Sequence, residues 1–265
     1  MLMRPRRSCL TVPASRPRLL EKARVLAADE VIIDLEDGVA PDEKAAARAN
    51  IAAEASGTLG VRINGLGTRW WRDDLAAVAA SHPDVVVVPK VESTGDIAAV
   101  ADLLPDGIGI EAQIESALGL VEVERIAAAE RLEALVFGPG DFAASLGVPV
   151  LRIGAGVWDY ALARISVAAH AWGLQAIDGP YAALRDLGGL RAAAERALAH
   201  GFDGKWVVHP DQLETVNDVF TPSSEEVERA RRLLAAADGA SLVDGEMVDA
   251  ATKRLAERLL ARAAR

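Results

Sequence analysis

The sequence contains few cysteines and histidines, the residues that form disulfides in small secreted domains and bind zinc in structural zinc sites. Its 265 residues include one cysteine, Cys9, and four histidines. A single cysteine excludes an intrachain disulfide, and without an export signal it indicates a reducing compartment. The cysteine and the histidines also lack the close spacing of structural zinc ligands. We therefore expect a cytoplasmic protein that folds without disulfides or structural zinc.

The chain also lacks a long hydrophobic run and an excess of positive charge. Its basic start, MLMRPRRSCL, is not followed by an apolar stretch of signal-peptide length, and no window approaches the length of a membrane span. The formal net charge of −10 argues against nucleic-acid binding, which requires a basic face. Local arginines or a metal ion can still hold a small anion. We expect neither a membrane nor a nucleic-acid partner.

What the sequence does contain is a regular alternation of strand and helix patterns. Eight short β-type runs are separated by Ala- and Leu-rich stretches with helical periodicity. Several of the runs are apolar throughout, which is typical of parallel strands covered on both faces. The number of strands and the chain length predict an α/β protein with a (β/α)8 TIM barrel; a doubly wound open sheet is the alternative. The runs are 8–12, 31–35, 60–64, 85–89, 108–114, 134–138, 174–178 and 205–209.

We assign residues 1–221 to this barrel and 222–265 to a C-terminal helical extension. The extension opens with TPSSEEVERARR, where a Pro and Ser start precedes a helical pattern. The chain then ends in an amphipathic helix. We expect the extension to pack on the barrel or on a neighbouring subunit.

Polar side chains stand at the ends of nearly all predicted strands. In (β/α)8 barrels the chemistry gathers at the carboxyl ends of the strands, so these side chains predict one shared site. The residues are Asp34, Glu36, Asp37, Arg62, Asn64, Lys90, Glu92, Gln113, Glu115, Asp141, Asp178 and His209.

The densest of these ends is VIIDLEDGVA, residues 31–40, where three carboxylates follow an apolar run. Adjacent carboxylates repel one another unless cations lie among them, which favours a cavity that holds positive charge. Individually, Asp34, Glu36 and Asp37 are equally compatible with capping the next helix or pairing with surface cations.

Glu115 and Asp141 are the best candidates for a metal pair. Each comes just after an apolar strand, in QIES and FGPGD, and Mg²⁺ takes a few carboxylate oxygens while keeping several waters. The alternative is that each acid forms a salt bridge with a helix arginine.

Arg62, in VRIN, lies between apolar neighbours, so its guanidinium must be paired. Its planar fork suits a carboxylate or a developing enolate oxygen, and a structural ion pair to Glu36 or Asp37 is compatible with that role. Lys90 could bind an anion, form a Schiff base or simply pair with an acid near a helix. His209 fits a packed, hydrogen-bonded histidine better than a general base.

The order of the motifs resembles a known family. The chain is similar to the citrate lyase β-subunit-like CoA-ester lyases of the HpcH/HpaI aldolase superfamily. The resemblance covers nearly the whole chain and rests on RSCLTVPASRP, DLEDGVAPDEK, VRIN, PKVES, IESALGL, FGPGDFAASLG, QAIDGP, GFDGKWVVHPDQ and GEMVD, in that order.

This resemblance implies Mg²⁺ (Mn²⁺ as the alternative) held by Glu115 and Asp141, with Glu115 also facing the substrate. It implies that Arg62 contacts the reacting end of the substrate and that Glu36 and Asp37 support it. It further implies a homotrimer or larger assembly, in which an aspartate near the C-terminus enters a neighbouring site. Asp249 matches that position, and Asp244 is the second choice.

The family's N-terminal element resembles PASRP, which makes Arg16 a candidate for the CoA end of the substrate. Thr11 stands where the family often has an aromatic residue. The implied reaction is the reversible cleavage of a 3-hydroxyacyl-CoA, such as citryl-, malyl- or citramalyl-CoA, into a short acyl-CoA and a 2-oxo acid. The alternatives are a metal-dependent pyruvate or 2-oxo acid aldolase without CoA, and an acyl-thioester-binding subunit of a multi-subunit citrate lyase.

Overall fold

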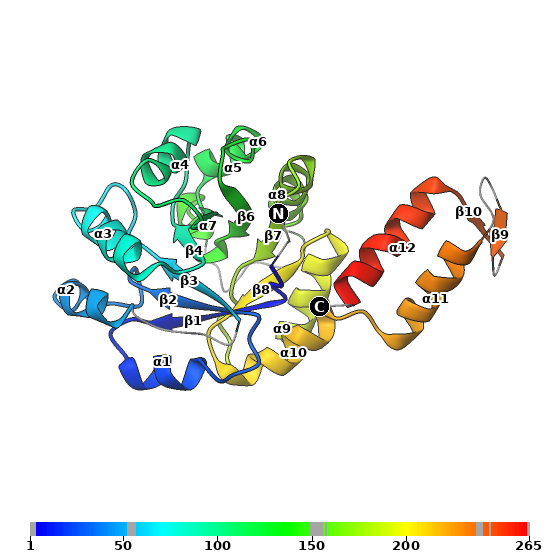
Figure 1. Ribbon diagram of the computed structural model, residues 1–265, viewed down its shortest axis with the longest axis horizontal. Helices are drawn as coiled ribbons and strands as arrows, with labels where there is room; N and C mark the ends of the chain where they lie inside the picture. The colour runs from blue at the N-terminus through cyan, green and yellow to red at the C-terminus, as the bar shows by residue number, and fades with distance from the viewer. Residues whose placement is uncertain are drawn as a thin grey trace. The chain divides into compact units, whose positions relative to one another are not determined.

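A computed structural model of the chain contains a closed barrel of eight parallel strands (Figure 1). The structure describes residues 4–51, 57–148, 156, 158–236, 241–243 and 245–263. The strands pair in chain order and β8 closes on β1, which confirms the predicted (β/α)8 barrel over an open sheet. They are β1 (Ser8–Pro13), β2 (Glu30–Asp34), β3 (Thr58–Arg62), β4 (Val85–Val88), β5 (Gly109–Ile114), β6 (Leu132–Phe137), β7 (Gln175–Asp178) and β8 (Gly204–Val207).

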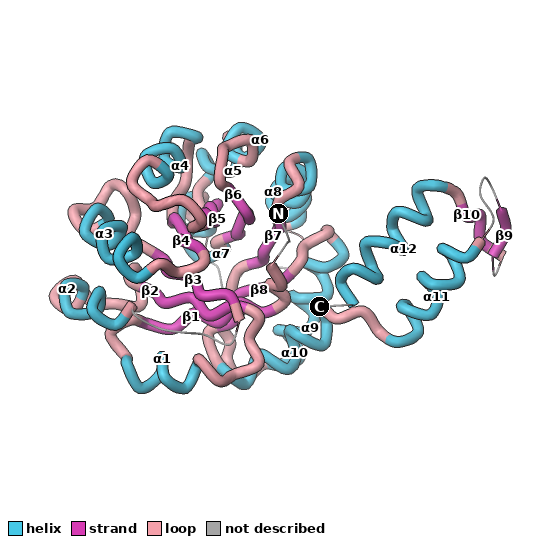
Figure 2. The backbone as a smooth tube through the Cα atoms, viewed as in Figure 1, coloured by secondary structure: helices cyan, strands magenta, loops and turns pink. Residues whose placement is uncertain are grey.

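Helices surround the strands and cover the outside of the barrel (Figure 2). Apolar positions at helical spacing turn toward the strands, as in α8, whose Leu162, Ile165 and Ala169 are buried. The helical elements of this part of the chain are α1 (Pro17–Ala23), α2 (Lys44–Ala47), η1 (Arg48–Asn50), α3 (Trp71–Ser81), α4 (Thr94–Ala101), α5 (Ala117–Val121), α6 (Val123–Ile126), α7 (Pro139–Ser145), α8 (Asp159–Ala171), α9 (Leu187–Ala199), η3 (Pro210–Gln212) and α10 (Leu213–Phe220).

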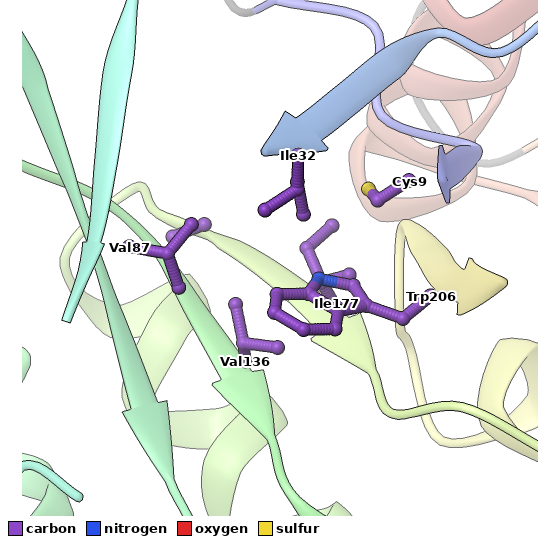
Figure 3. Packing of buried hydrophobic residues seen from close by; sticks show 7 residues of the cluster. Cys9, Ile32, Val87, Val136, Ile177 and Trp206 are labelled. Carbon is purple, nitrogen blue, oxygen red and sulfur yellow. The ribbon is translucent and has the colours of Figure 1, made fainter. Parts of the chain in front are cut away.

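The middle of the barrel interior is apolar. Because side chains alternate along a strand, Glu30, Ile32 and Asp34 of β2 face the same side, with the apolar residue between the two acids. Ile32 belongs to a buried cluster that we call the apolar plug (Figure 3). The plug consists of Cys9, Ile32, Val87, Ala134, Val136, Ile177 and Trp206.

Charged residues lie beyond the plug toward the amino ends of the strands. Arg6 is buried there, with Nε 2.6 Å from a carboxylate oxygen of Glu111 and Nη2 2.6 Å from one of Glu133. Its Nη1 donates to the side-chain oxygen of Gln175 at 2.6 Å, and its Nε is 3.4 Å from Glu30. One guanidinium therefore faces three carboxyl groups. We call this cluster of Arg6, Glu30, Glu111 and Glu133 the barrel floor.

Contacts divide the chain into two compact units, Met1–Asn217 and Asp218–Arg265. The second unit contains α11 (Ser224–Ala235) and α12 (Ala250–Ala263), which pack against each other, and the antiparallel strands β9 (Ser241–Val243) and β10 (Glu246–Val248). The helices were predicted, but the two short strands were not. The predicted boundary after residue 221 lies between α10 and α11, and the packing of the extension stays a prediction. Within the described ranges, every helix falls short of the length and apolar character that crossing a membrane requires.

Candidate active site

Asp34 and Arg62 form a two-point ion pair at the carboxyl ends of neighbouring strands. They are register partners in β2 and β3. Arg62 donates from Nε to Oδ1 of Asp34 at 2.7 Å and from Nη2 to Oδ2 at 2.8 Å. Asp34 also accepts the backbone N–H groups of Glu36 at 2.9 Å and Gly38 at 2.8 Å. Burial alone would raise the pKa of Asp34, but the charge and hydrogen bonds of Arg62 outweigh it and hold that pKa below its usual value.

The other edge of the Arg62 guanidinium, at Nη1, makes fewer contacts. Nη1 lies 3.1 Å from Oε2 of Glu36, yet among the described residues this buried oxygen has no hydrogen-bond partner. The face of the guanidinium lies over Trp206, with Cζ 5.4 Å from the ring centroid. Arg62 is thus fixed by Asp34 and the indole, while its Nη1 edge can still donate to an oxygen atom of a ligand.

Lys90 lies among the acidic residues that follow β2, β5 and β6. It comes two residues after the end of β4, and its ammonium lies at the centre of four carboxylates. The distances from Nζ to the nearest carboxylate oxygens are 2.5 Å for Glu36, 3.4 Å for Asp141, 3.9 Å for Glu115 and 4.0 Å for Asp37. The structure therefore brings Glu36, Glu115 and Asp141 into one cluster with Arg62, and Asp37 lies at its exposed margin.

Glu115 and Asp141 fit a divalent cation that takes its other ligands from water and substrate. Glu115 is buried, and burial raises its pKa to about 8; Lys90 opposes this rise, whereas Glu36 and Asp141 add to it. A further cation beside this carboxyl would therefore favour its ionised form. Among the described residues, no three acidic, histidine or cysteine side chains assemble into a metal site by themselves. Two carboxylates with water and substrate oxygens are what Mg²⁺ commonly uses.

A buried lysine that sequence reasoning missed fixes the end of β2. Lys44 donates from Nζ to the carbonyl oxygens of Leu35 and Glu36, both at 2.9 Å. Asn64 donates to the same Leu35 oxygen at 3.0 Å and is held by the buried Asp74 at 2.6 Å. These contacts determine the path of the backbone that carries Glu36. The DEK of DLEDGVAPDEK contains Lys44, but nothing in that pattern shows that the lysine turns inward.

Two other predicted residues, Arg16 and Asp249, make contacts of their own. Arg16 is exposed at the start of α1 and lies 3.4 Å from Glu43. Asp249 belongs to the second unit, where it accepts the backbone N–H of Thr252 at 2.9 Å and its hydroxyl at 3.0 Å, so it caps α12. Asp244 lies outside the described residues. The roles given to them stay predictions.

The structure thus combines a (β/α)8 barrel with a cluster of charged side chains at its carboxyl rim. A family model for HpcH/HpaI aldolase/citrate lyase matches residues 7–210. The chain therefore belongs to the HpcH/HpaI aldolase/citrate lyase family, and its class is that of the carbon–carbon lyases.

Individual members of the family show to which proteins the chain is similar. A (3S)-malyl-CoA thioesterase of Cereibacter sphaeroides is 44% identical over 259 residues, which cover 92% of this chain and 90% of the relative. An L-malyl-CoA/β-methylmalyl-CoA lyase of the same species is 39% identical over 302 residues, covering 98% and 95%. The solved structure of CitE from Mycobacterium tuberculosis in complex with magnesium, acetoacetate and coenzyme A superposes with a TM-score of 0.84 at 35% identity, covering 97% of this chain and 98% of that one.

Proposed function

We propose that the protein is a divalent-metal-dependent lyase that cleaves or forms a 3-hydroxyacyl-CoA, with a short acyl-CoA and a 2-oxo acid as the other side of the reaction. The observation that carries this proposal is the cluster around Lys90, which brings Glu115 and Asp141 together with Glu36, whose other carboxylate oxygen lies 3.1 Å from Nη1 of Arg62. Malyl-CoA and β-methylmalyl-CoA are the first substrates to test, because the C. sphaeroides lyase is named for them.

The difficult point of this reaction is the thioester enolate, which exists briefly while the carbon–carbon bond breaks or forms. Arg62 would place a fixed positive charge at the developing enolate oxygen. Because Asp34 already holds the Nε and Nη2 edge, little reorganisation is needed when that charge appears. Glu36 lies against Nη1 and would share the guanidinium with the substrate oxygen.

Glu115 and Asp141 would hold Mg²⁺, with Mn²⁺ as a substitute. When bound, such an ion polarises the hydroxyl or keto oxygen of the substrate as a Lewis acid. Glu115 is held in place by the backbone N–H of Lys90, which donates to its Oε1 at 2.8 Å. The buried carboxylate is thereby oriented before any ligand arrives.

Two further roles complete the proposal. An acid or base must move protons at the hydroxyl group or the acyl carbon, and we assign this role to Asp249 of a neighbouring copy in a homotrimer or larger assembly. Arg16 is assigned to the CoA end of the substrate; its exposed position suits contact with a phosphate group.

A second candidate function is hydrolysis of the thioester. It is favoured by one observation, the 44% identity to a (3S)-malyl-CoA thioesterase. The same electrostatic groups would then stabilise charge on the thioester oxygen during attack by water.

The deciding experiment incubates the purified chain with malyl-, β-methylmalyl-, citramalyl- and citryl-CoA, with Mg²⁺, with Mn²⁺ and with EDTA. Lyase activity releases an acyl-CoA and a 2-oxo acid and stops with EDTA. Release of free CoA and a hydroxy acid would replace the lyase with a thioesterase. Cleavage of the free hydroxy-oxo acid alone would indicate the aldolase, and activity that requires added partner chains would indicate a citrate lyase subunit.

A further inference from the structure

Lys90 has a backbone conformation that its residue type seldom adopts. Its φ is +54°, in the left-handed region. Among the described residues other than glycine, only His82 and Arg131 share a positive φ, and His82 occupies a helix C-cap, where that conformation is common. A left-handed residue with a long side chain is strained, and such strain persists where the surroundings fix it, often at functional sites.

The left-handed turn lets the two ends of Lys90 reach two different acids. Its backbone N–H donates to Oε1 of Glu115 at 2.8 Å. Its ammonium donates to Oε1 of Glu36 at 2.5 Å. Glu115 follows β5 and Glu36 follows β2, so one residue connects acids from two separated strands of the barrel.

Glu36 carries the contact on to Arg62. One carboxylate oxygen of Glu36 faces Lys90 and the other lies 3.1 Å from Nη1 of Arg62. The side chain of Lys90 is 44% exposed, against 11% for Arg62, so small solutes can reach it.

We propose that Lys90 is a positioning residue that joins the two halves of the active site. Its ammonium holds Glu36 against the guanidinium of Arg62, while its backbone N–H orients Glu115 of the acid pair. The effect of Lys90 on turnover rests on the proposed function; its hold on Glu36 does not.

The test separates the side chain from the backbone. Lys90→Gly keeps a residue that tolerates the left-handed conformation and its N–H, but removes the ammonium. We expect kcat to fall about tenfold to a hundredfold in Lys90→Gly and Lys90→Met, the range seen when a residue that orients metal ligands is lost, with KM changed less than about threefold. Lys90→Arg should restore most of the loss, and Lys22→Met, a charge removal on the exposed face of α1, should leave kcat unchanged.

Chemical rescue distinguishes positioning from a general effect on the fold. Added methylammonium should raise kcat of Lys90→Gly several-fold, because the truncated side chain leaves space for the ion, and should not help Lys90→Met. Turnover of Lys90→Met within about twofold of the wild type, or failure of both arginine and methylammonium to recover activity, would overturn the proposal.

A second measurement is independent of catalysis. Melting temperatures of Lys90→Met, Glu36→Gln and the double variant form a cycle, and direct contact predicts that the double variant shifts by clearly less than the sum of the single shifts. If the wild type acts on no thioester, the proposed function fails and this cycle alone decides the hold of Lys90 on Glu36. Additive shifts would remove that hold.

Discussion

Asp34 accepts two hydrogen bonds from one edge of the Arg62 guanidinium, from Nε at 2.7 Å and from Nη2 at 2.8 Å. The two residues end adjacent strands in register, so the strand pairing itself determines the orientation of the arginine. The opposite edge, at Nη1, lies 3.1 Å from Oε2 of Glu36 and is the edge that the proposed function assigns to a substrate oxygen.

We expect Asp34→Asn to lower kcat at least tenfold with a smaller change in KM, because the amide cannot hold both N–H groups of the arginine edge. Steady-state kinetics on the active thioester measure this. The matched control is Asp29→Asn, since Asp29 makes the same two-point pair with Arg7, at 2.8 Å to both Nε and Nη2. Equal losses in the two variants would contradict a specific role for Asp34.

Arg62→Ala should fold and lose activity by about a hundredfold or more, since a preorganised charge at the developing oxyanion is removed. Circular dichroism checks the fold and product formation checks the rate. Normal turnover by a folded Arg62→Ala protein would show that the enolate is stabilised elsewhere.

Metal dependence should follow Glu115 and Asp141. EDTA should abolish wild-type activity and Mg²⁺ should restore it, while Glu115→Gln and Asp141→Asn should each weaken Mn²⁺ binding by about tenfold or more. Mn²⁺ binding can be followed by electron paramagnetic resonance without substrate. Glu92→Gln removes another rim carboxylate and serves as the control; unchanged Mn²⁺ binding in both acid-pair variants would mean that the ion is held by other ligands.

The assignment of Asp249 to a neighbouring site predicts complementation. Arg62→Ala and Asp249→Asn should each be nearly inactive, but after mixing and subunit exchange some sites combine an intact Arg62 with an intact Asp249. Activity should then recover to a fraction of the wild-type value, measured against each variant treated alone. An active Asp249→Asn protein would restrict this residue to its capping bond with Thr252.

The barrel floor predicts a pH dependence of stability. Burial and the charge of Glu111 raise the pKa of Glu30 to about 8, although Arg6 opposes them; Cys9 and Glu133 also face it. An unfolded glutamate titrates near pH 4, so the folded chain binds the proton more tightly. The corresponding stability is complete below about pH 4 and is lost as the pH rises to about 8.

Replacing Glu30 with Gln should remove this loss, because the amide is neutral at every pH. Between pH 6 and 9 the free energy of unfolding of the wild type should fall by about 3 kcal/mol more than that of Glu30→Gln. Urea denaturation at several pH values measures the difference. Glu21→Gln, at an exposed position on α1, should behave like the wild type; parallel curves for wild type and Glu30→Gln would show that Glu30 does not hold the proton.

The sequence predicted the strands well because several of the predicted runs are apolar throughout, and Val85–Val88 is the extreme case. The carboxyl ends followed from those runs, and with them Glu36, Arg62, Glu115 and Asp141. The partners of Arg62 were predicted in part: the expected ion pair to Glu36 is present at 3.1 Å, but the two hydrogen bonds to Asp34 were not foreseen. That choice depends on the register between two strands, which a pattern within one strand does not contain.

Lys90 and Lys44 were underestimated for a related reason. The direction in which a lysine side chain points depends on the backbone conformation of that residue. Nothing in PKVES indicates a left-handed residue after the proline. Lys44 is a charged residue whose ammonium is buried against the carbonyl oxygens of Leu35 and Glu36 and lies over the ring of Trp70, which local periodicity does not reveal. The strands β9 and β10 contain three residues each, which is too few for an alternation of apolar and polar residues to be recognised.

The apolar plug has a practical consequence for anyone who modifies this protein. Apolar side chains screen charge poorly, so the acids of the barrel floor and those of the carboxyl rim act on one another across the plug more strongly than they would through the same distance of water. A substitution made at the floor to tolerate alkaline conditions should therefore be followed by kinetics at the rim. Tolerance to harsh media and turnover are coupled design variables in this scaffold.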